Sequence, residues 1–309
     1  PVVGGSWTAP GGASHSDVFD PAVDANGIYT YTVAGGTACE ATATVTVAVQ
    51  IPAANAGVDQ ALCIGDTVQL AATGGTTFLW SPSATLSDVN IADPLAFPLA
   101  TTTYTVSVTD GLGCIALDSM VVAVNPLPVV NAGADAAICA GANANLGGTP
   151  TGPSSSTYQW SPGAGLNNST AANPIAQPAG TTTYTVLVTD GNQCSASDSV
   201  TVTVNPLPVI NAGQDTSVCL GSSVGLNAIG TGGFSWSPST GLSATDIADP
   251  IATPTATTTY TVTLTDANNC ENTDDVVVTV LGLPKADAGA DVWERTGFDV
   301  QLNVSGGGT

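Results

Sequence analysis

The strongest constraint on this chain is one pattern of residues that is written several times along it. Each copy holds an early Asp, a Cys, a Trp, a Thr-Thr-Tyr-Thr-Val segment, a second Asp and a second Cys. In the middle copy these positions are Asp135, Cys139, Trp160, Tyr184, Asp190 and Cys194. The pattern recurs at intervals of roughly 76–80 residues, and a period of that length indicates tandem domains.

The residues between these positions predict an all-β fold. Thr, Val, Gly and Pro are abundant, Lys and Arg total 2, and nearly all of the 24 acidic residues are Asp, which favours turns over helices. Candidate strands at 67–72, 77–80, 103–109 and 119–124 are separated by Gly, Pro, Asn and Asp. Short strands at this spacing predict a sandwich of two antiparallel sheets in each unit.

The junctions between units are short and rich in proline. The predicted units are a C-terminal half-unit at 1–50, complete units at 51–126, 127–206 and 207–282, and an N-terminal part at 283–309. Asn125-Pro126-Leu127-Pro128 and Asn205-Pro206-Leu207-Pro208 hold two prolines each, which fix φ and favour extended backbone. We therefore expect an extended rod cut from a longer protein, whose nearest partners are neighbouring repeats of that protein.

The net charge of −22 excludes a nucleic-acid-binding surface, which needs clustered positive charge. The sequence contains no run of eighteen apolar residues, so no membrane-spanning helix is predicted.

The cysteines give the strongest chemical signal. Each complete unit has two, roughly 51–55 residues apart, which predicts one disulfide within each domain, worth about 4 kcal/mol in the chain-entropy model. The predicted pairs are Cys63 with Cys114, Cys139 with Cys194, and Cys219 with Cys270. The seventh, Cys39, belongs to the half-unit. Zinc is the competing interpretation, but zinc thiolates normally come in close pairs. Disulfides predict an oxidising, extracellular compartment.

The recurring aromatic residues have two interpretations. They are Trp80, Trp160 and Trp236, with Tyr104, Tyr184 and Tyr260. Exposed rings could stack on sugars, whereas core rings would pack between the sheets, as in many sandwich domains. The apolar surroundings of these residues favour the core.

The recurring Asp residues are the candidate metal ligands. They are Asp59, Asp110, Asp135, Asp190, Asp215 and Asp266. Calcium takes six to eight oxygens, and several Asp residues near one hinge would supply them. The alternative is that each carboxylate caps a turn through nearby backbone. Calcium is the only cofactor that the sequence suggests.

Catalytic constellations are nearly absent, and we predict a protein that is not an enzyme. His15 is the single histidine, and its neighbours Ser14, Ser16 and Asp17 are adjacent only in sequence, which does not make a triad.

The units resemble PKD-type immunoglobulin-like domains. The resemblance rests on Ala-Gly-x-Asp at each start, on Tyr158-Gln159-Trp160 and its variants, and on Thr-Tyr-Thr-Val-x-Val-Thr-Asp near each end. With the cysteines and the Asn-Pro-Leu-Pro hinges, they are similar to tandem repeats of very large secreted surface proteins of Bacteroidota, including gliding-motility adhesins and other cargo of type IX secretion. The resemblance covers nearly the whole chain and implies a place on the bacterial cell surface.

The resemblance also implies O-glycosylation, since secreted proteins of that phylum carry glycans within Asp-Ser/Thr-apolar triplets. The hydroxyls in matching triplets are those of Thr67, Ser119 and Ser199. A strand start with its hydroxyl facing water explains the same triplets without a glycan.

Three functional hypotheses follow. The first is a non-catalytic stalk segment of an extracellular adhesin or fibre, projecting a distal binding region in adhesion or gliding motility. The second is a self-assembling filament in which copies of the chain contact each other. The third is a carbohydrate-binding or spacer array of a secreted hydrolase, with surface glycans as partners.

Overall fold

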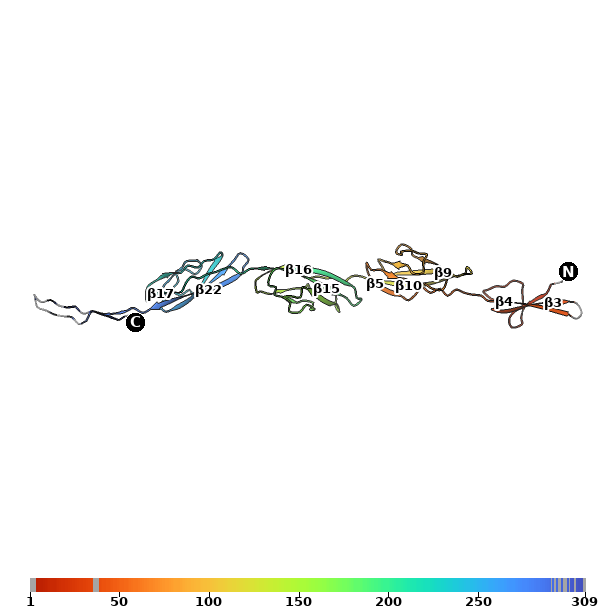
Figure 1. The fold of residues 1–309 in the computed structure, drawn as a ribbon, viewed down its shortest axis with the longest axis horizontal. Helices are drawn as coiled ribbons and strands as arrows, with labels where there is room; N and C mark the ends of the chain where they lie inside the picture. Colours follow the sequence, from red (N-terminus) through yellow and green to blue (C-terminus); the bar gives the residue numbers. More distant parts are fainter. Residues whose placement is uncertain are drawn as a thin grey trace. The chain divides into compact units, whose positions relative to one another are not determined.

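The computed structural model describes residues 4–35, 39–289, 291, 293, 296, 299, 301–302 and 304–307 (Figure 1). The described residues form strands, turns and loops, and no helix occurs among them, so none of them could cross a membrane as a helix. The chain divides into two compact units. The first comprises Pro1–Leu127 with Asn192–Cys194, and the second comprises Pro128–Gly191 with Ser195–Thr309.

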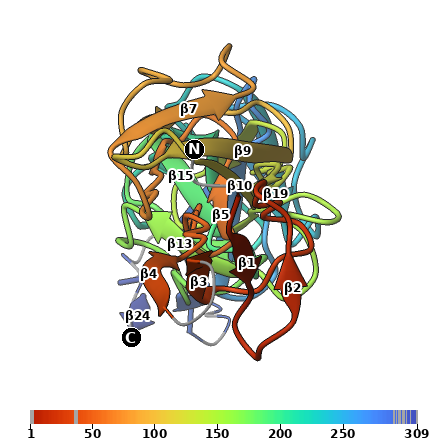
Figure 2. The ribbon, with the colours of Figure 1, turned by 90° about the vertical axis from the view of Figure 1, so that its right-hand side faces the viewer.

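The first unit begins with a four-stranded antiparallel sheet. Its strands are β1 (Ser6–Thr8), β2 (Ser14–His15), β3 (Gly27–Gly35) and β4 (Cys39–Val47). Their order across the sheet is β2-β1-β3-β4, and Figure 2 shows them in that order. Tyr29 on β3 is only 3% exposed.

The first unit continues with a complete repeat made of two sheets. Its strands are β5 (Gln60–Cys63), β6 (Val68–Gln69), β7 (Thr77–Ser81), β8 (Leu95–Ala96), β9 (Thr102–Thr109) and β10 (Ile115–Asn125). One sheet has the order β5-β10-β9-β7, in which β5 runs parallel to β10 and the other pairs are antiparallel. The second sheet is the antiparallel pair β6-β8.

The second unit holds two repeats with the same strand order. The first contains β11 (Ala136–Cys139), β12 (Ala144–Asn145), β13 (Thr157–Ser161), β14 (Ile175–Ala176), β15 (Thr182–Thr189) and β16 (Ser195–Asn205). The other contains β17 (Thr216–Cys219), β18 (Val224–Gly225), β19 (Gly233–Ser237), β20 (Ile251–Ala252), β21 (Thr258–Thr265) and β22 (Glu271–Leu281). A last antiparallel pair joins β23 (Lys285–Asp287) to β24 (Ser305–Gly307).

Alternation along the long strands builds the core of each repeat. On β15, Tyr184, Val186 and Val188 are fully buried, while Thr183 before them is exposed, and of the two residues between them Leu187 is exposed and Thr185 is half-buried. This period of two is what a strand with one covered face requires. Trp160 on β13 packs into the same cluster.

The strand order identifies the repeats as immunoglobulin-like sandwiches. The third, fifth and sixth strands of each repeat lie in one sheet, which the first strand joins at its edge, and the second and fourth strands form the other sheet. The third, fifth and sixth strands share a sheet in immunoglobulin domains too, and a buried Trp lies on the third strand in both. Antibody domains place a disulfide cysteine two residues after the tyrosine of the fifth strand. Val106, Val186 and Val262 occupy that position here and are fully buried.

The prediction of one disulfide within each repeat is wrong. Cys63 bonds to Cys194 and Cys139 bonds to Cys270. Cys63 lies opposite Asn125 at the end of β10, whereas Cys114 immediately precedes the start of that eleven-residue strand. A strand of this length separates its ends by about 35 Å, far beyond the ~7 Å limit between the Cα atoms of a disulfide. The cysteines of one repeat therefore lie at opposite ends of its sheet.

Candidate functional site: the disulfide-closed junctions

The first cysteine of each repeat lies beside the segment that leads to the next repeat. Cys63 ends β5 and pairs with Asn125, and the amide of Ile64 donates to the Asn125 carbonyl at 2.9 Å. Cys139 pairs with Asn205 in the same register. Each sulfur is thus held next to an Asn-Pro-Leu-Pro junction by the parallel pairing of the first strand with the last.

The second cysteine of each repeat lies in a capped turn before the last strand. The Asp266 carboxylate accepts hydrogen bonds from the amides of Asn268 at 2.8 Å and Cys270 at 2.9 Å. The residue before the cysteine has a positive φ in all three repeats, +85° at Gly113, +65° at Gln193 and +60° at Asn269. Gly and Asn tolerate this conformation, so the sequence favours the turn geometry at Gly113 and Asn269, and Gln193 adopts the same geometry without that preference.

The two disulfides join the capped turn of one repeat to the first strand of the repeat before it. Cys63 and Cys194 lie together in the first unit, and Cys139 and Cys270 lie in the second. Both bridges have a Cα–Cα distance of 5.5 Å and span 131 residues. Cys194 and Cys270 are fully buried. Consecutive repeats are therefore connected twice, by the peptide chain and by a disulfide.

Three cysteines are unbridged among the described residues. Cys39 and Cys219 are exposed, and Cys114 is half-buried. The pairing predicted for Cys114 with Cys63 and for Cys219 with Cys270 does not form, because the bridged partners are bound to other repeats.

The six candidate calcium ligands bond to backbone or lie in the cysteine turns. Asp110 accepts from the amides of Leu112 and Cys114, as Asp266 does in its own turn. Asp190 occupies the same place in the turn before Cys194. The early Asp residues extend the pairing of the first strand with the last: Asp59 accepts from Val121, Asp135 from Thr201 and Asp215 from Val277, at 2.8–2.9 Å. Among the residues that the structure describes, no group of three or more His, Cys, Asp or Glu side chains could hold a metal ion.

A further set of carboxylates stabilises the start of each repeat by accepting hydrogen bonds from its backbone. The sequence did not single them out as ligands. Asp118, Asp198 and Asp274 accept hydrogen bonds from the amides of Ala56, Ala132 and Ala212 at 2.7–2.8 Å. The hydrogen bonds from Ala56 and Ser119 hold the pKa of Asp118 below its ordinary value of 3.8. Stability from this group is therefore present above that value and is lost as the pH falls through the folded pKa.

Replacing Asp198 with Ala should destabilise its repeat by about 1–3 kcal/mol, because the fully buried amide of Ala132 loses its acceptor. The denaturant midpoint measures the loss, and the exchange rate of the Ala132 amide proton locates it. Asp198→Asn keeps an acceptor oxygen and should lose less. Equal stability of Asp198→Ala and the parent chain would contradict this stabilising role.

The recurring aromatic residues lie in the cores. Trp80, Trp160 and Trp236 are 1–3% exposed, and their indole nitrogens donate to the carbonyls of Ile91, Ala171 and Ile247 at 2.9–3.1 Å. Tyr184 and Tyr260 are fully buried, with hydroxyls that donate to Ala164 and Thr240. Burial raises the pKa of both phenols. These rings offer no stacking surface to a sugar, which counts against the carbohydrate-binding hypothesis.

The three candidate glycan acceptors are exposed. Thr67 precedes β6, while Ser119 and Ser199 lie on the outer faces of β10 and β16. Ser199 shares a 2.9 Å hydrogen bond with Thr185. The exposure fits both a glycan acceptor and an ordinary strand hydroxyl.

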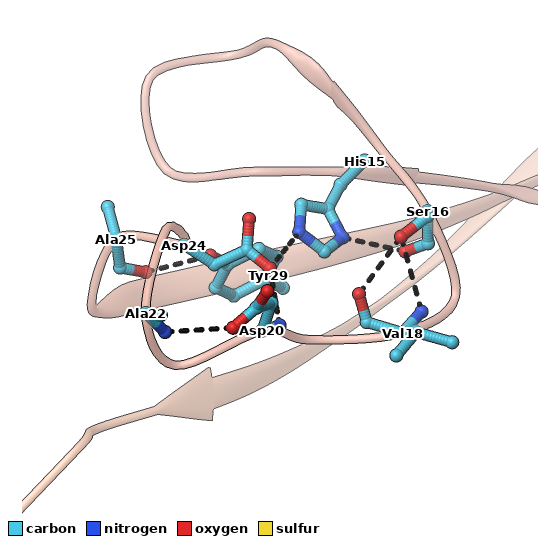
Figure 3. Close-up of polar contacts among 8 residues, drawn as sticks. All are labelled: His15, Ser16, Val18, Asp20, Ala22, Asp24, Ala25 and Tyr29. Carbon is cyan, nitrogen blue, oxygen red and sulfur yellow. Dashed lines mark hydrogen bonds and ion pairs between the residues drawn. The ribbon is translucent and has the colours of Figure 1, made fainter.

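His15 forms an ion pair that could not be foreseen from its sequence neighbours. Its Nε2 lies 2.8 Å from a carboxylate oxygen of Asp24, and its Nδ1 donates to the Ser16 carbonyl at 2.6 Å (Figure 3). The Ser16 hydroxyl donates to the Val18 carbonyl, so it does not face the imidazole as a nucleophile would. The Asp24 carboxylate, followed by the Ser16 carbonyl, raises the pKa of His15 above its ordinary value of 6.5.

The NMR titration of this single histidine should give a pKa above 6.5, and Asp24→Asn should bring it back toward that value. A raised pKa stabilises the fold below pH 6.5 and ceases to do so as the pH rises through the folded pKa. The pKa of Asp24 is lowered below its ordinary value of 3.8, first by the Asp20 amide and then by His15. The pH range in which the ion pair stabilises the fold therefore ends, on the acid side, where Asp24 takes up its proton. A wild-type pKa at or below 6.5 would contradict the pair.

Two features of the sequence are consistent with disulfides between repeats. In each complete repeat the second cysteine precedes the last predicted strand, while the first cysteine ends the first one. The separations from Cys63 to Cys194 and from Cys139 to Cys270 are also equal. Six cysteines allow fifteen connectivities, and only the parallel register of the first and last strands selects among them.

Comparison with known proteins gives fold likeness only. No protein-family model matches the sequence, and no curated protein matches it. A three-domain fragment of titin is 14% identical, with a TM-score of 0.41, over 75% of this chain and 99% of the fragment. The first eight immunoglobulin domains of Down Syndrome Cell Adhesion Molecule are 16% identical, with a TM-score of 0.36, over 93% of this chain and 45% of that one. Extracellular domains 3–5 of Drosophila OTK are 13% identical, with a TM-score of 0.29, over 75% of this chain and 96% of that one.

These scores are too low to carry an argument about function, so the assignment rests on the strand order and the buried Trp. By these criteria the chain is an all-β array of tandem immunoglobulin-like domains with disulfides between consecutive domains.

Proposed function

We propose that this chain is a non-catalytic stalk segment of an extracellular adhesin or fibre, which carries tension and projects a distal binding region. The observation that supports the proposal is the disulfide beside each junction between complete repeats. If the disulfides served only to raise the stability of each domain, a bridge inside each domain would raise its free energy of unfolding by a similar amount. Bridges between domains instead restrict the motion of one repeat against the next.

The disulfides also support an oxidising location outside the cytosol. Attachment to a bacterial surface, secretion by the type IX route and a role in gliding motility are the finer parts of the proposal, and they rest on the resemblance of the repeats to surface adhesins of Bacteroidota. At His15, the Ser16 carbonyl accepts from the imidazole while the Ser16 hydroxyl donates to the Val18 carbonyl, and this arrangement supports a non-catalytic role for the one histidine.

Small-angle scattering of the oxidised chain, with its free thiols alkylated, tests the stalk. A compact chain of this length would have a radius of gyration of about 19 Å. We expect a monomer with at least twice that value, and a broader distribution of sizes after reduction. A value near 19 Å would overturn the stalk, and a mass that grows with concentration in the alkylated chain would favour the filament hypothesis.

Calcium binding is a separate proposal for the same junctions, supported by the number of Asp carboxylates near them. If calcium binds there, a chelator should lower the unfolding temperature, because a ligand that binds only the folded state stabilises it. The measurement is calorimetry with excess calcium and with chelator at constant ionic strength. An unchanged midpoint would leave the carboxylates with their backbone roles alone.

A further inference from the structure

We propose that Cys219 and Cys114 are the two halves of a third bridge of the same kind, which joins one copy of this chain to a second copy. The partner of Cys219 is then the capped-turn cysteine of another immunoglobulin-like repeat, supplied by the second chain as Cys114. This extends the proposed stalk from single chains to covalently joined ones.

Cys219 occupies the same place as the two first-strand cysteines that are bridged. It ends β17 and pairs with Leu281 at the end of β22, in the parallel register that Cys63 and Cys139 have with their own last strands. The amide of the next residue, Leu220, donates to the Leu281 carbonyl at 2.9 Å. Behind the sulfur, Val218 is buried, as Leu62 is behind Cys63. Cys219 is therefore held in the same backbone position as the bridged cysteines, and it is exposed and unbridged.

Cys114 occupies the same place as the two turn cysteines that are bridged. Asp110 accepts from the Cys114 amide at 2.9 Å, and Asp266 accepts from the Cys270 amide at 2.9 Å. Both preceding residues have a positive φ. The bridged cysteines of this class, Cys194 and Cys270, are fully buried, whereas Cys114 is only half-buried. The difference in burial is the one that a missing partner would produce.

The turn distinguishes Cys114 from Cys39, the other unbridged cysteine that stands at the start of a long strand. Cys39 begins β4, and the residue four positions before it is Gly35, whereas Asp110 stands four positions before Cys114 and accepts from its amide. The capped turn is the shared feature of the cysteines that bond to a first strand. The geometry therefore assigns Cys114, and not Cys39, to Cys219.

The bridge forms by thiol–disulfide exchange with a small-molecule disulfide such as oxidised glutathione. The Cys219 thiolate attacks that disulfide and releases one glutathione thiolate, which leaves a mixed disulfide. The Cys114 thiolate of the second copy then attacks the Cys219 sulfur and releases the second glutathione thiolate. Two cysteine thiols are oxidised, one glutathione disulfide is reduced, and each released thiolate takes up one proton.

Two complementary variants of the full chain test the bridge. Cys219→Ser keeps Cys39 and Cys114, and the double variant Cys39→Ser/Cys114→Ser keeps Cys219. In a glutathione redox buffer, the mixture should give a one-to-one covalent dimer in at least about tenfold excess over either variant alone, because docked surfaces raise the effective concentration of the thiols. Mass spectrometry should find the Cys219–Cys114 peptide, and the wild-type chain should form a ladder of larger multimers on non-reducing gels.

Adding Asp110→Ala to the Cys219→Ser chain should slow the linking reaction, because the turn loses its cap. Dimers that form equally fast in each variant alone would overturn the proposal, since they would show unselective collisions of exposed thiols. A bond from Cys219 to Cys39 would overturn it as well, and so would free thiols after full oxidation of the mixture. The scattering test uses alkylated chains, so the stalk and the bridge between copies succeed or fail separately.

Discussion

Pulled from its two ends in a force experiment, the chain should extend by on the order of 500 Å more after reduction than in the oxidised state. In the oxidised chain, the shortest covalent route from residue 51 to residue 282 runs through 51–63, then back through 139–194, then through 270–282. The two disulfides join these segments. The route holds about 80 residues, against about 230 in the reduced chain, and each extended residue spans about 3.5 Å.

Single variants separate this arrangement from one with a bridge inside each repeat. Cys114→Ser should leave the oxidised extension unchanged, because Cys114 is unbridged. Cys139→Ser should lengthen it by roughly 20 residues, or about 70 Å, because the route then runs directly from Cys194 to residue 282. With bridges inside the repeats, Cys114→Ser would instead release about 50 residues. A gain of that size in Cys114→Ser would refute the observed pairing.

Replacing Trp160 with Ala should destabilise the repeat that contains it by about 3–5 kcal/mol. The indole is 1% exposed, packs against the core of that repeat, and donates to the Ala171 carbonyl at 3.0 Å. Truncation would leave a large cavity and an unpaired carbonyl. For a domain of about 80 residues, such a loss lowers the unfolding temperature by on the order of 15–30 °C.

Scanning calorimetry should show one transition displaced to lower temperature while those of the other repeats move less. Trp293 supplies the matched control, because its side chain is 90% exposed and Trp293→Ala should change stability by less than about 0.5 kcal/mol. Equal shifts in both variants, or no shift in Trp160→Ala, would be incompatible with a core role for the recurring Trp.

Much of the fold could be read from residues whose environment is decided locally. The alternation around Tyr184 specifies a strand with one buried face, and the structure confirms it. An Asp at the start of a Gly-rich or Asn-rich turn specifies a cap for the amides two and four residues later, and Asp110 and Asp266 provide it. Such features depend on residues only a few positions apart, and the two-residue period of a strand and the side-chain chemistry of a turn determine the local conformation.

The cysteine pairing could not be read in this way. The sequence by itself determined the tandem sandwiches, their aromatic cores and the presence of two cysteines at fixed places in each repeat. Only the tertiary structure decided which cysteines meet, because distance along the chain does not say at which end of a sheet a residue lies. Parallel pairing of the first strand with the last puts Cys139 and Cys194 at opposite ends of β16, too far apart to bond. Cys139 and Cys194 therefore each bond to a cysteine of a neighbouring repeat, Cys270 and Cys63 respectively.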